Sequence, residues 1–352
     1  MSEKIHILVV RLSAIGDIVM ATPLLAALRG RYPRARIAWL VQPESRALLQ
    51  HQPDLDEVIV WPRAEWRSLV QSGAWLRLGR EILGLRRKLR SRQFDLALDV
   101  QGLLKSGFLT WLSGARERVG LGSREGSQWL MTRVVDRGGD SKRIASEYLH
   151  LAQRLGLPTE TFEMQIAVAQ ADLDYAWDLL AAEDLQQGYL VISPFTTRPQ
   201  KHWFADRWIE LVTRLEKRFG WRTVLLGGPG DRQEADRFEQ ALGPCLINQA
   251  GQTSLTQAAA LIKQARLLIG VDTGLTHMGI AANRPTIALF GSTCPYLDTT
   301  HDNAVVLYHK LSCSPCKRNP TCDNRFDCMR AISVDEVLEQ AERLLQARGA
   351  TA

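Results

Sequence analysis

The segment 267–282, which reads LLIGVDTGLTHMGIAA, limits the possible folds of this chain more than any other segment. An apolar run of strand length leads through a turn of small residues into a run that favours a helix. Asp272 and Thr273 are residue types that often cap a helix N-terminus. The free N–H groups and the dipole at that end favour an anion within reach of His277, although a capped helix behind a buried strand has the same pattern.

Runs typical of strands and helices alternate along the whole chain. In the first half the predicted strands are 5–10, 36–41, 58–60, 94–100 and 118–121, and one of the intervening helices is 74–91. In the second half the predicted strands are 189–193, 223–226, 267–271 and 286–290, and the predicted helices are 172–183, 205–219, 232–242, 254–265, 276–282 and 334–346. This order predicts an α/β protein with two parallel sheets, each covered on both faces.

A domain boundary is expected within residues 157–170, which contain a proline and few periodic signals. The predicted domains are residues 1–165 and 166–352, and the helix 334–346 closes the second. Two Rossmann-like domains of this kind usually face a central cleft at the carboxyl ends of both sheets. Inside the first domain, Pro23 either kinks a helix or begins one behind Thr22.

The composition is that of an ordinary globular protein, with 45% hydrophobic and 23% charged residues. No apolar run reaches the ~18 residues of a membrane span, and MSEKIHILVVRLS has too few apolar residues for a secretory signal, so we expect a cytoplasmic protein. The net charge is +6. Residues 63–92 contain nine Lys and Arg but only two Glu, which indicates an anionic partner or a solvated helix face.

Three further loops follow predicted strands and carry groups suited to chemistry. In 13–17 (SAIGD), Asp17 either caps a helix or serves as a general base. In 193–203 (SPFTTRPQKHW), hydroxyls and cations suit phosphate oxygens, and the alternative is an exposed polar loop. In 227–231 (GGPGD), Asp231 either caps a turn or accepts hydrogen bonds from a ribose. The chain has no GxGxxG after its first strand, no P-loop motif and no HExxH, which argues against dinucleotide, P-loop and zinc-protease chemistry.

Four motifs lie in order along nearly the whole chain: RLSAIGD, FDLALDVQGLLKS, SPFTTRPQKHW and VDTGLTHMGIAANRPTIALFGST. Together they resemble the bacterial ADP-heptose:lipopolysaccharide heptosyltransferases, family 9 of the glycosyltransferases. Within the family, TTRPQKHW and DVQGLLKS are most similar to heptosyltransferase I, which adds L-glycero-D-manno-heptose to Kdo2-lipid A. The resemblance implies a GT-B fold and an inverting, metal-independent transfer from ADP-heptose that needs no cofactor.

The resemblance also implies roles for individual residues. Asp17 matches the family's proposed catalytic base, and Lys201 would stabilise the departing diphosphate together with helix-terminal amides. Asp99 is the competing carboxylate, but it lies inside the predicted strand 94–100. The implied donor-binding residues are Thr196, Thr197, Lys201, Asp231, Asp272, Thr273, Gly274, Leu275 and His277. At position 231 the family usually has Glu.

Kdo2-lipid A carries phosphates and carboxylates and lies in the inner leaflet, so the resemblance implies cations that contact this acceptor. The implied acceptor-binding residues are Ser13, Gly16, Arg63, Arg67, Lys105, Arg116 and Arg124, with Trp61 and Trp66 as interfacial aromatics. We therefore expect peripheral contact with the anionic inner membrane on its cytoplasmic face. Binding of nucleic acid is not expected, because RNP-type aromatic motifs and zinc-finger spacings are absent.

The C-terminal thiols are a departure from the heptosyltransferase I pattern. The first two are spaced as C-x2-C, but the x5 spacings that follow are not the usual paired C-x2-C arrangement of a zinc site, so we expect reduced thiols that pack a loop, with zinc as the alternative. The four thiols are Cys313, Cys316, Cys322 and Cys328. The alternative functions are heptosyltransferase II, another family 9 enzyme with a different acceptor or sugar, and a nucleotide-sugar-binding protein without catalysis. The presence of both Asp17 and Lys201 argues against the last of these.

Overall fold

The computed structural model describes residues 5–317 and 319–349. It divides into two compact units, one formed by the residues up to Ser141 with Ala145–Ala167, the other by Lys142–Ile144 with the residues from Val168 onward. Each unit contains a six-stranded sheet whose pairings are all parallel, as the alternation of strand and helix patterns predicts. Among the described residues, no helix is long and apolar enough to cross a membrane.

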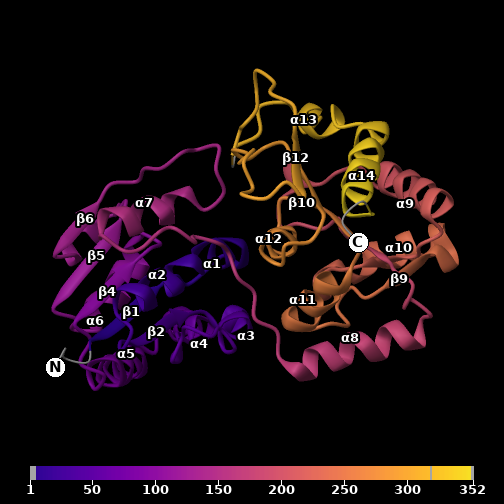
Figure 1. Ribbon diagram of the computed structural model, residues 1–352. Coiled ribbons are helices and arrows are strands. Elements are labelled where there is room, and N and C mark those ends of the chain that lie inside the picture. Colours follow the sequence, from indigo (N-terminus) through magenta and orange to yellow (C-terminus); the bar gives the residue numbers. More distant parts are fainter. Residues whose placement is uncertain (1–4, 318, 350–352) are drawn as a thin grey trace. The chain divides into compact units, whose positions relative to one another are not determined.

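In the first unit the strands lie in the order β3-β2-β1-β4-β5-β6 (Figure 1). These strands are β1 (His6–Val10), β2 (Arg36–Val41), β3 (Glu57–Val60), β4 (Leu96–Asp99), β5 (Glu117–Leu121) and β6 (Arg133–Val135). The helices are α1 (Ile15–Ala21), α2 (Pro23–Arg31), α3 (Arg46–Leu49), α4 (Arg63–Gln71), α5 (Trp75–Arg90), α6 (Leu104–Leu112) and α7 (Ser146–Arg154), with 3-10 turns η1 (Pro43–Ser45) and η2 (Ser127–Leu130). The order reverses between β1 and β4, where the carboxyl ends of parallel strands usually form a binding crevice.

The two faces of the first sheet bury different side chains, because successive residues of a strand point to opposite faces. Ile7 and Val9 of β1 belong to one core cluster, with side chains of α2 and α7. Leu8 and Val10 belong to a second cluster, with side chains of α5 and α6. Figure 1 shows α2 and α7 on one side of this sheet and α5 on the other. The sheet is therefore covered on both faces, so functional side chains have to come from the loops at the ends of its strands.

In the second unit the strands lie in the order β12-β11-β10-β7-β8-β9. These strands are β7 (Leu190–Ser193), β8 (Thr223–Leu225), β9 (Leu246–Asn248), β10 (Leu267–Val271), β11 (Thr286–Phe290) and β12 (Ala304–Tyr308). The helices are α8 (Gln170–Ala182), α9 (Ala205–Phe219), α10 (Arg232–Leu242), α11 (Leu255–Gln264), α12 (Gly274–Ala281), α13 (Asp327–Arg330) and α14 (Val334–Gly349), with 3-10 turns η3 (Pro199–Lys201), η4 (Pro229–Asp231) and η5 (Gly243–Cys245). The order reverses between β10 and β7, so the loops after these two strands lie at the crevice position of this sheet.

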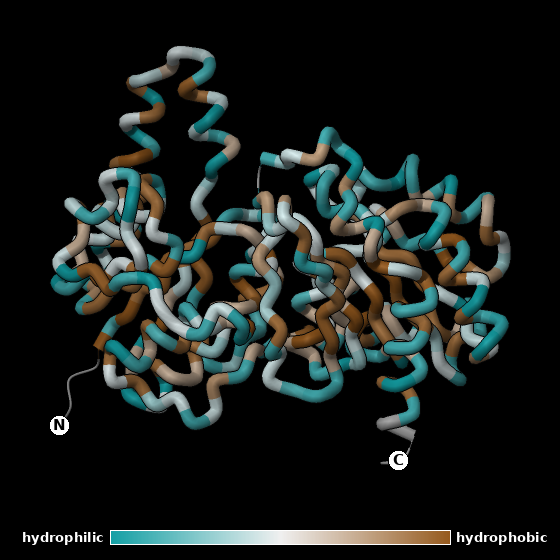
Figure 2. The backbone as a smooth tube through the Cα atoms, turned by 90° about the horizontal axis from the view of Figure 1, so that it is seen from above, coloured by the Kyte–Doolittle hydropathy of each residue, from teal (hydrophilic) through white to brown (hydrophobic). Residues whose placement is uncertain are grey.

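One face of the second sheet packs against α9, α10 and α14 in a single core cluster that includes Ile269 and Val271 of β10. On the other face, α12 approaches β10 closely because two glycines leave room for it. A Cβ at Gly270 would overlap Thr276, and a Cβ at Gly279 would overlap Leu268. Figure 2 shows hydrophobic residues gathered in the interior of each unit and polar residues on the surface windings.

The structure differs from the sequence-based prediction at the sheet edges and at Pro23. Strands β6, β9 and β12 were not predicted; they pair on one side only, and β6 and β9 have three residues each. Helices α4 and α7 were also not predicted. Pro23 begins α2 rather than kinking a longer helix. Thr22 is the N-cap residue of α2, but its side chain makes no capping hydrogen bond, because its hydroxyl donates to the Val19 carbonyl.

Candidate active site

At the carboxyl end of β10, Asp272 lies at the centre of a buried polar cluster. Its Oδ2 atom is 2.5 Å from Nζ of Lys201, which comes from η3 after β7, and both side chains are largely buried. Thr293, which follows β11, donates from Oγ1 to the same carboxylate oxygen at 2.6 Å. Three loops from neighbouring strands therefore meet at one carboxylate, as parallel topology allows.

His277 completes this cluster from the first turns of α12. Its Nε2 atom lies 3.4 Å from Oδ1 of Asp272, and its Nδ1 atom lies 2.6 Å from the hydroxyl of Tyr296. The side chains of His277 and Tyr296 are both buried. His277 is thus held on both sides of its ring, which fixes the ring beside the N-terminus of α12.

The charge of Asp272 is stabilised by its partners. Burial by itself would raise the pKa of this carboxyl, but the hydrogen bond and electrostatic interaction with the His277 ring, together with the Lys201 ammonium, hold the pKa well below its ordinary value. Burial and the neighbouring Asp272 charge raise the pKa of Tyr296 well above its ordinary value. Asp272 is therefore a carboxylate and Tyr296 a neutral hydroxyl at neutral pH.

The residue types at the N-terminus of α12 predicted a side-chain cap, and the structure shows none. Thr273 is the N-cap residue, but its side chain makes no capping hydrogen bond and its Oγ1 lies 3.4 Å from Oγ of Ser193. Asp272 is turned toward Lys201 and His277 instead. The first N–H groups of α12, which include those of Gly274 and Leu275, are consequently not satisfied by a cap and keep their capacity to bind an anion.

The other predicted donor-binding residues lie on loops at the same edge of the second sheet. Thr196 is half-buried, and its carbonyl oxygen lies 2.8 Å from Nε2 of His202. Thr197 is exposed. Asp231 accepts a hydrogen bond from the Gly228 N–H at 2.7 Å, which is the turn-capping role, and its role toward a ribose stays a prediction.

In the first unit, Asp17 lies in the first turn of α1, just after β1. Its Oδ2 atom lies 2.6 Å from Nη2 of Arg11 and accepts the Ala14 N–H at 3.1 Å. Arg11 is buried and also donates to the Val100 carbonyl at the end of β4. The sequence analysis missed Arg11, although its place at the end of the first predicted strand was a signal for it. Asp17 has the capping role and at the same time presents a carboxylate that is 36% exposed.

Asp99, the competing carboxylate, is fully buried at the end of β4. It accepts hydrogen bonds from the N–H groups of Gln101 and Gly102 and from Oγ of Ser106, at 3.0–3.1 Å. Burial raises its pKa, and these hydrogen bonds offset part of that effect. Gly102 has φ +69, and a Cβ there would overlap the Leu121 carbonyl, so this turn requires glycine. Asp99 therefore organises the loop between β4 and α6.

Most of the predicted acceptor-binding residues lie at the carboxyl edge of the first sheet. Burial lowers the pKa of Lys105, and the charges of Arg63 and Arg11 add to that effect, while the charge of Glu125 opposes it. The other residues of this edge are half-buried Ser13, buried Gly16 and exposed Arg124; exposed Arg67 lies further along α4.

Three predictions for this unit are corrected by the structure. Arg116 precedes β5, so it lies at the amino edge of the sheet, where its Nη1 atom is 3.7 Å from Oδ1 of Asp95. Trp61 and Trp66 are not interfacial, because both are buried in the core with their rings in edge-to-face contact. Trp75, at the start of α5, is one of the exposed aromatic side chains of this unit.

The C-terminal thiols are free cysteines, with Cys322 and Cys328 buried. Burial raises the pKa of Cys316 and of Cys328, and the neighbouring thiols add to both shifts. Among the residues that the structure describes, no group of three His, Cys, Asp or Glu side chains is arranged to hold a metal ion. The loop that carries these thiols is hydrogen-bonded to loops near the Asp272 cluster. The Lys317 N–H donates to the Ser292 carbonyl, and the Lys317 carbonyl accepts from Nε2 of Gln200.

Comparisons with known proteins give the family. Lipopolysaccharide heptosyltransferase 1 of Pseudomonas aeruginosa is 27% identical over 363 residues, which are 97% of this chain and 98% of the relative. The structure of Escherichia coli ADP-heptose lps heptosyltransferase II superimposes with a TM-score of 0.77 at 25% identity, covering 98% of this chain and 100% of that chain. E. coli heptosyltransferase WaaC with ADP-2-deoxy-2-fluoro heptose gives a TM-score of 0.72 at 24% identity, covering 96% and 99%.

These structural likenesses and the two parallel sheets identify the fold as GT-B. The model of glycosyltransferase family 9 (heptosyltransferase) matches residues 82–325, which is more than half of the chain. This chain therefore belongs to glycosyltransferase family 9, the heptosyltransferases, and is a glycosyl-transferring enzyme.

Proposed function

We propose that this enzyme transfers L-glycero-D-manno-heptose from ADP-heptose to Kdo2-lipid A of the lipopolysaccharide core, with inversion at the anomeric carbon. The similar proteins described above are lipopolysaccharide heptosyltransferases, and one of them was solved with an ADP-heptose analogue. The observation that carries the proposal is Lys201, whose Nζ atom is 2.5 Å from Asp272 beside the open N-terminus of α12. A departing ADP needs this combination of a fixed cation and helix N–H groups to stabilise its developing charge.

Asp272 serves in this proposal as the residue that positions Lys201. An ammonium has three donors, and the contacts to Oδ2 and to the carbonyl oxygen of Asp272 use two of them, at 2.5 and 3.4 Å. The third donor is left for a phosphate oxygen. Gly274 and Leu275 contribute backbone N–H groups, and Thr196, Thr197, Thr273, Asp231 and His277 complete the proposed donor site.

Asp17 is the proposed general base for the acceptor hydroxyl. Both of its contacts, to Arg11 and to the Ala14 N–H, fall on Oδ2. Within the described part of the chain no partner is found for Oδ1, so this oxygen is available to take a proton. A single displacement with inversion requires such a base on the side of the sugar opposite the departing ADP.

The proposed acceptor site is the cationic carboxyl edge of the first sheet, including Ser13, Gly16, Arg63, Arg67, Lys105 and Arg124. We further propose that the enzyme works at the cytoplasmic face of the inner membrane, with α4 and α5 as its contact. Their exposed apolar side chains include Val70, Trp75, Leu76 and Leu83. In α5, Leu76, Arg80, Leu83 and Arg87 recur at a spacing of three or four residues, so they lie on one helix face that combines apolar and cationic groups.

A second candidate is heptosyltransferase II, which the structural likeness favours slightly through its higher TM-score. One experiment tests both functions. Purified enzyme receives ADP-heptose with Kdo2-lipid A and heptosyl-Kdo2-lipid A as competing acceptors, and the products are identified by mass spectrometry. We expect heptose on Kdo2-lipid A; exclusive use of the heptosylated acceptor would assign the second function, and no transfer to either would reject both.

A further inference from the structure

A broad groove of about 1410 Å³ lies at the amino edge of the first sheet, at the opposite end of the strands from Asp17. It is bounded by residues that precede strands, such as Asp95 before β4 and Arg116 before β5, and by the ends of α2 and α5. Four arginines line it: Arg31, Arg34, Arg90 and Arg116. Asp95 is its single acidic lining residue. The groove therefore has an excess of positive charge that the proposed reaction does not use.

The positive charge of this groove is largely uncompensated. Asp95 is already engaged, because its Oδ2 accepts the His6 N–H at 2.9 Å and its Oδ1 faces Arg116 at 3.7 Å. For Arg31, Arg34 and Arg90, no acidic partner is found among the described residues. Gathering like charges without counter-charges costs free energy, which an anionic ligand would recover.

A neighbouring pocket provides a comparison, because its arginines are paired with an acidic side chain. There Arg36 and Arg92 both pair with Glu57, and Arg92 does so through a two-pronged contact. These contacts, with the Arg92 hydrogen bond as the largest effect, lower the pKa of Glu57, so the pair is ionised and satisfied. Arg31, Arg34 and Arg90 of the groove have no such acidic partner among the described residues, although they lie at the same edge of the same sheet.

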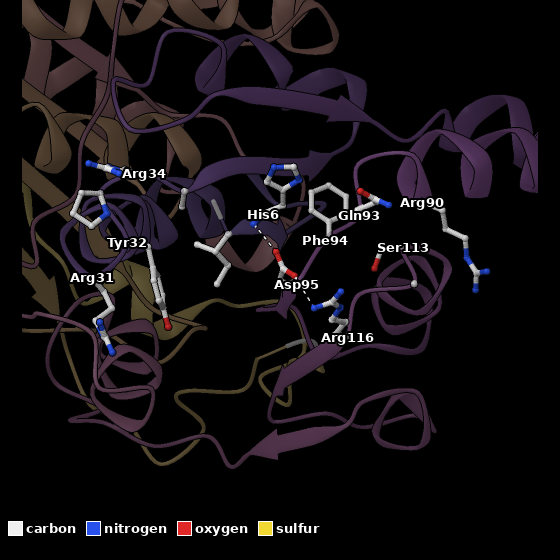
Figure 3. A pocket seen from close by; sticks show the side chains of 14 residues that line it. His6, Arg31, Tyr32, Arg34, Arg90, Gln93, Phe94, Asp95, Ser113 and Arg116 are labelled. Atoms are coloured by element: carbon white, nitrogen blue, oxygen red, sulfur yellow. Dashed lines mark hydrogen bonds and ion pairs between the residues drawn. The ribbon is translucent and has the colours of Figure 1, made fainter. Parts of the chain in front are cut away.

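The arrangement of the guanidinium groups limits the kind of anion. Figure 3 shows Asp95 between His6 and Arg116, with Arg31, Tyr32 and Arg34 to one side and Arg90 to the other. The guanidinium groups are spread along the groove and do not converge on one point. Arg31 also packs over the ring of Tyr32, 5.2 Å from its centre, which gives that side of the groove an aromatic surface. A single small anion would reach one of these cations, whereas a ligand with several phosphates would reach most of them.

We propose that this groove is a second anion-binding site, separate from the proposed donor site, for a ligand that presents two or more phosphate groups. The same chemistry is offered by a soluble polyphosphorylated molecule and by the headgroups of an anionic lipid surface. Arginine suits either source, because its planar fork of donors matches phosphate oxygens. The inference is independent of the proposed function, since no residue of the proposed donor or base site lines the groove.

The test uses the full chain and two probes. Tripolyphosphate binding is measured by calorimetry in saturating ADP, which occupies the proposed donor site. Sedimentation is measured with vesicles of phosphatidylcholine, with and without phosphatidylglycerol. The variant is Arg34→Gln with Arg116→Gln, because neither residue lies in a helix whose dipole it would complement. The control is Arg237→Gln with Arg343→Gln, two exposed arginines of α10 and α14 that remove the same charge.

We expect the groove variant to weaken binding about 25-fold, or about fivefold for each arginine, while the control stays within twofold of the wild type. Loss of tripolyphosphate binding alone identifies a soluble ligand, and loss of phosphatidylglycerol-dependent sedimentation alone identifies a lipid surface. The melting temperatures of both variants are compared, so that loss of folding is not counted as loss of binding. Equal binding by the groove variant and the control, with both probes, overturns the inference.

Discussion

The guanidinium of Arg11 lies 2.6 Å from the Asp17 carboxylate, and both contacts of that carboxylate fall on one oxygen. This geometry predicts that Asp17→Asn lowers kcat by about 10²–10⁴-fold, the range for a positioned general base. ADP affinity should stay within a few-fold of the wild type, because Asp17 belongs to the first unit and the proposed donor residues to the second. Steady-state kinetics with ADP titrations check both values. Near-normal turnover in Asp17→Asn would reject this residue as the base.

Arg11 is predicted to act through Asp17. Arg11→Lys keeps the charge but loses the second donor that reaches the Val100 carbonyl, so the carboxylate is less firmly placed. We expect a fall in kcat with little change in KM, together with a shift of the acidic limb of the pH–rate profile. A variant that loses stability but keeps the wild-type kcat and pH profile would show that Arg11 is only structural.

Gly274 is predicted to admit the donor diphosphate to the N-terminus of α12. Gly274→Val places a branched side chain where the phosphate must approach the backbone, so ADP affinity should fall by at least tenfold, about 1.4 kcal/mol at 25 °C. Calorimetry with ADP measures the loss, and circular dichroism verifies the fold. The matched control is Gly84→Val, because a Cβ at Gly84 meets no neighbouring atom and Gly84 lies in α5, outside the proposed donor site. If folded Gly274→Val binds ADP normally, this loop lies outside the donor site.

The lowered pKa of Asp272 predicts how the stability of the protein depends on pH. Its pKa is lower in the folded protein than in the unfolded chain, so its contribution to stability is fully present above the ordinary carboxyl pKa of about 3.9. That contribution is lost as the pH falls below this value toward the folded-state pKa. Asp272→Asn should therefore cost about 1–3 kcal/mol at neutral pH, and the difference from the wild type should shrink in acid. Urea unfolding of both proteins across this range measures it, and a difference independent of pH would contradict the prediction.

The exposed face of α4 and α5 predicts binding to anionic vesicles that weakens with salt, because each cation near such a surface contributes about 1 kcal/mol. Trp75→Ala with Leu76→Ala should weaken this binding, since these side chains are 64% and 89% exposed. Trp177→Ala is the control, because Trp177 is 51% exposed on α8 in the second unit. Vesicle sedimentation provides the measurement. Equal effects of the two sets of substitutions would exclude this face as the contact.

The strands at the centre of each sheet could be predicted from sequence, because a strand buried on both faces is a continuous apolar run. The edge strands β6 and β9 could not, since each has only three residues and pairs on one side only, unlike the three-residue strand β8, which is paired on both sides. The turns around Asp17 and Asp272 were found because small and polar residues follow apolar runs there. Tyr296 and Thr293 were missed because their link to Asp272 and His277 depends on β11 lying beside β10. Arg116 was misplaced although it precedes a predicted strand, which in a parallel sheet puts it at the amino edge.

The position of β1 has a consequence for the order in which the chain folds during synthesis. β1 is made before its partners, yet it lies in the middle of its sheet, between β2 and β4. Its pairing with β4 joins residues about ninety positions apart, such as Val10 and Asp99, and the core cluster beneath it also needs Tyr148 and Leu151 of α7. Because the ribosome adds residues one at a time, β1 therefore lacks part of its strand pairing and core packing until α7 has emerged. We expect nascent chains arrested before α7 is exposed to be digested readily by protease, and chains arrested after Ala167 is exposed to be resistant.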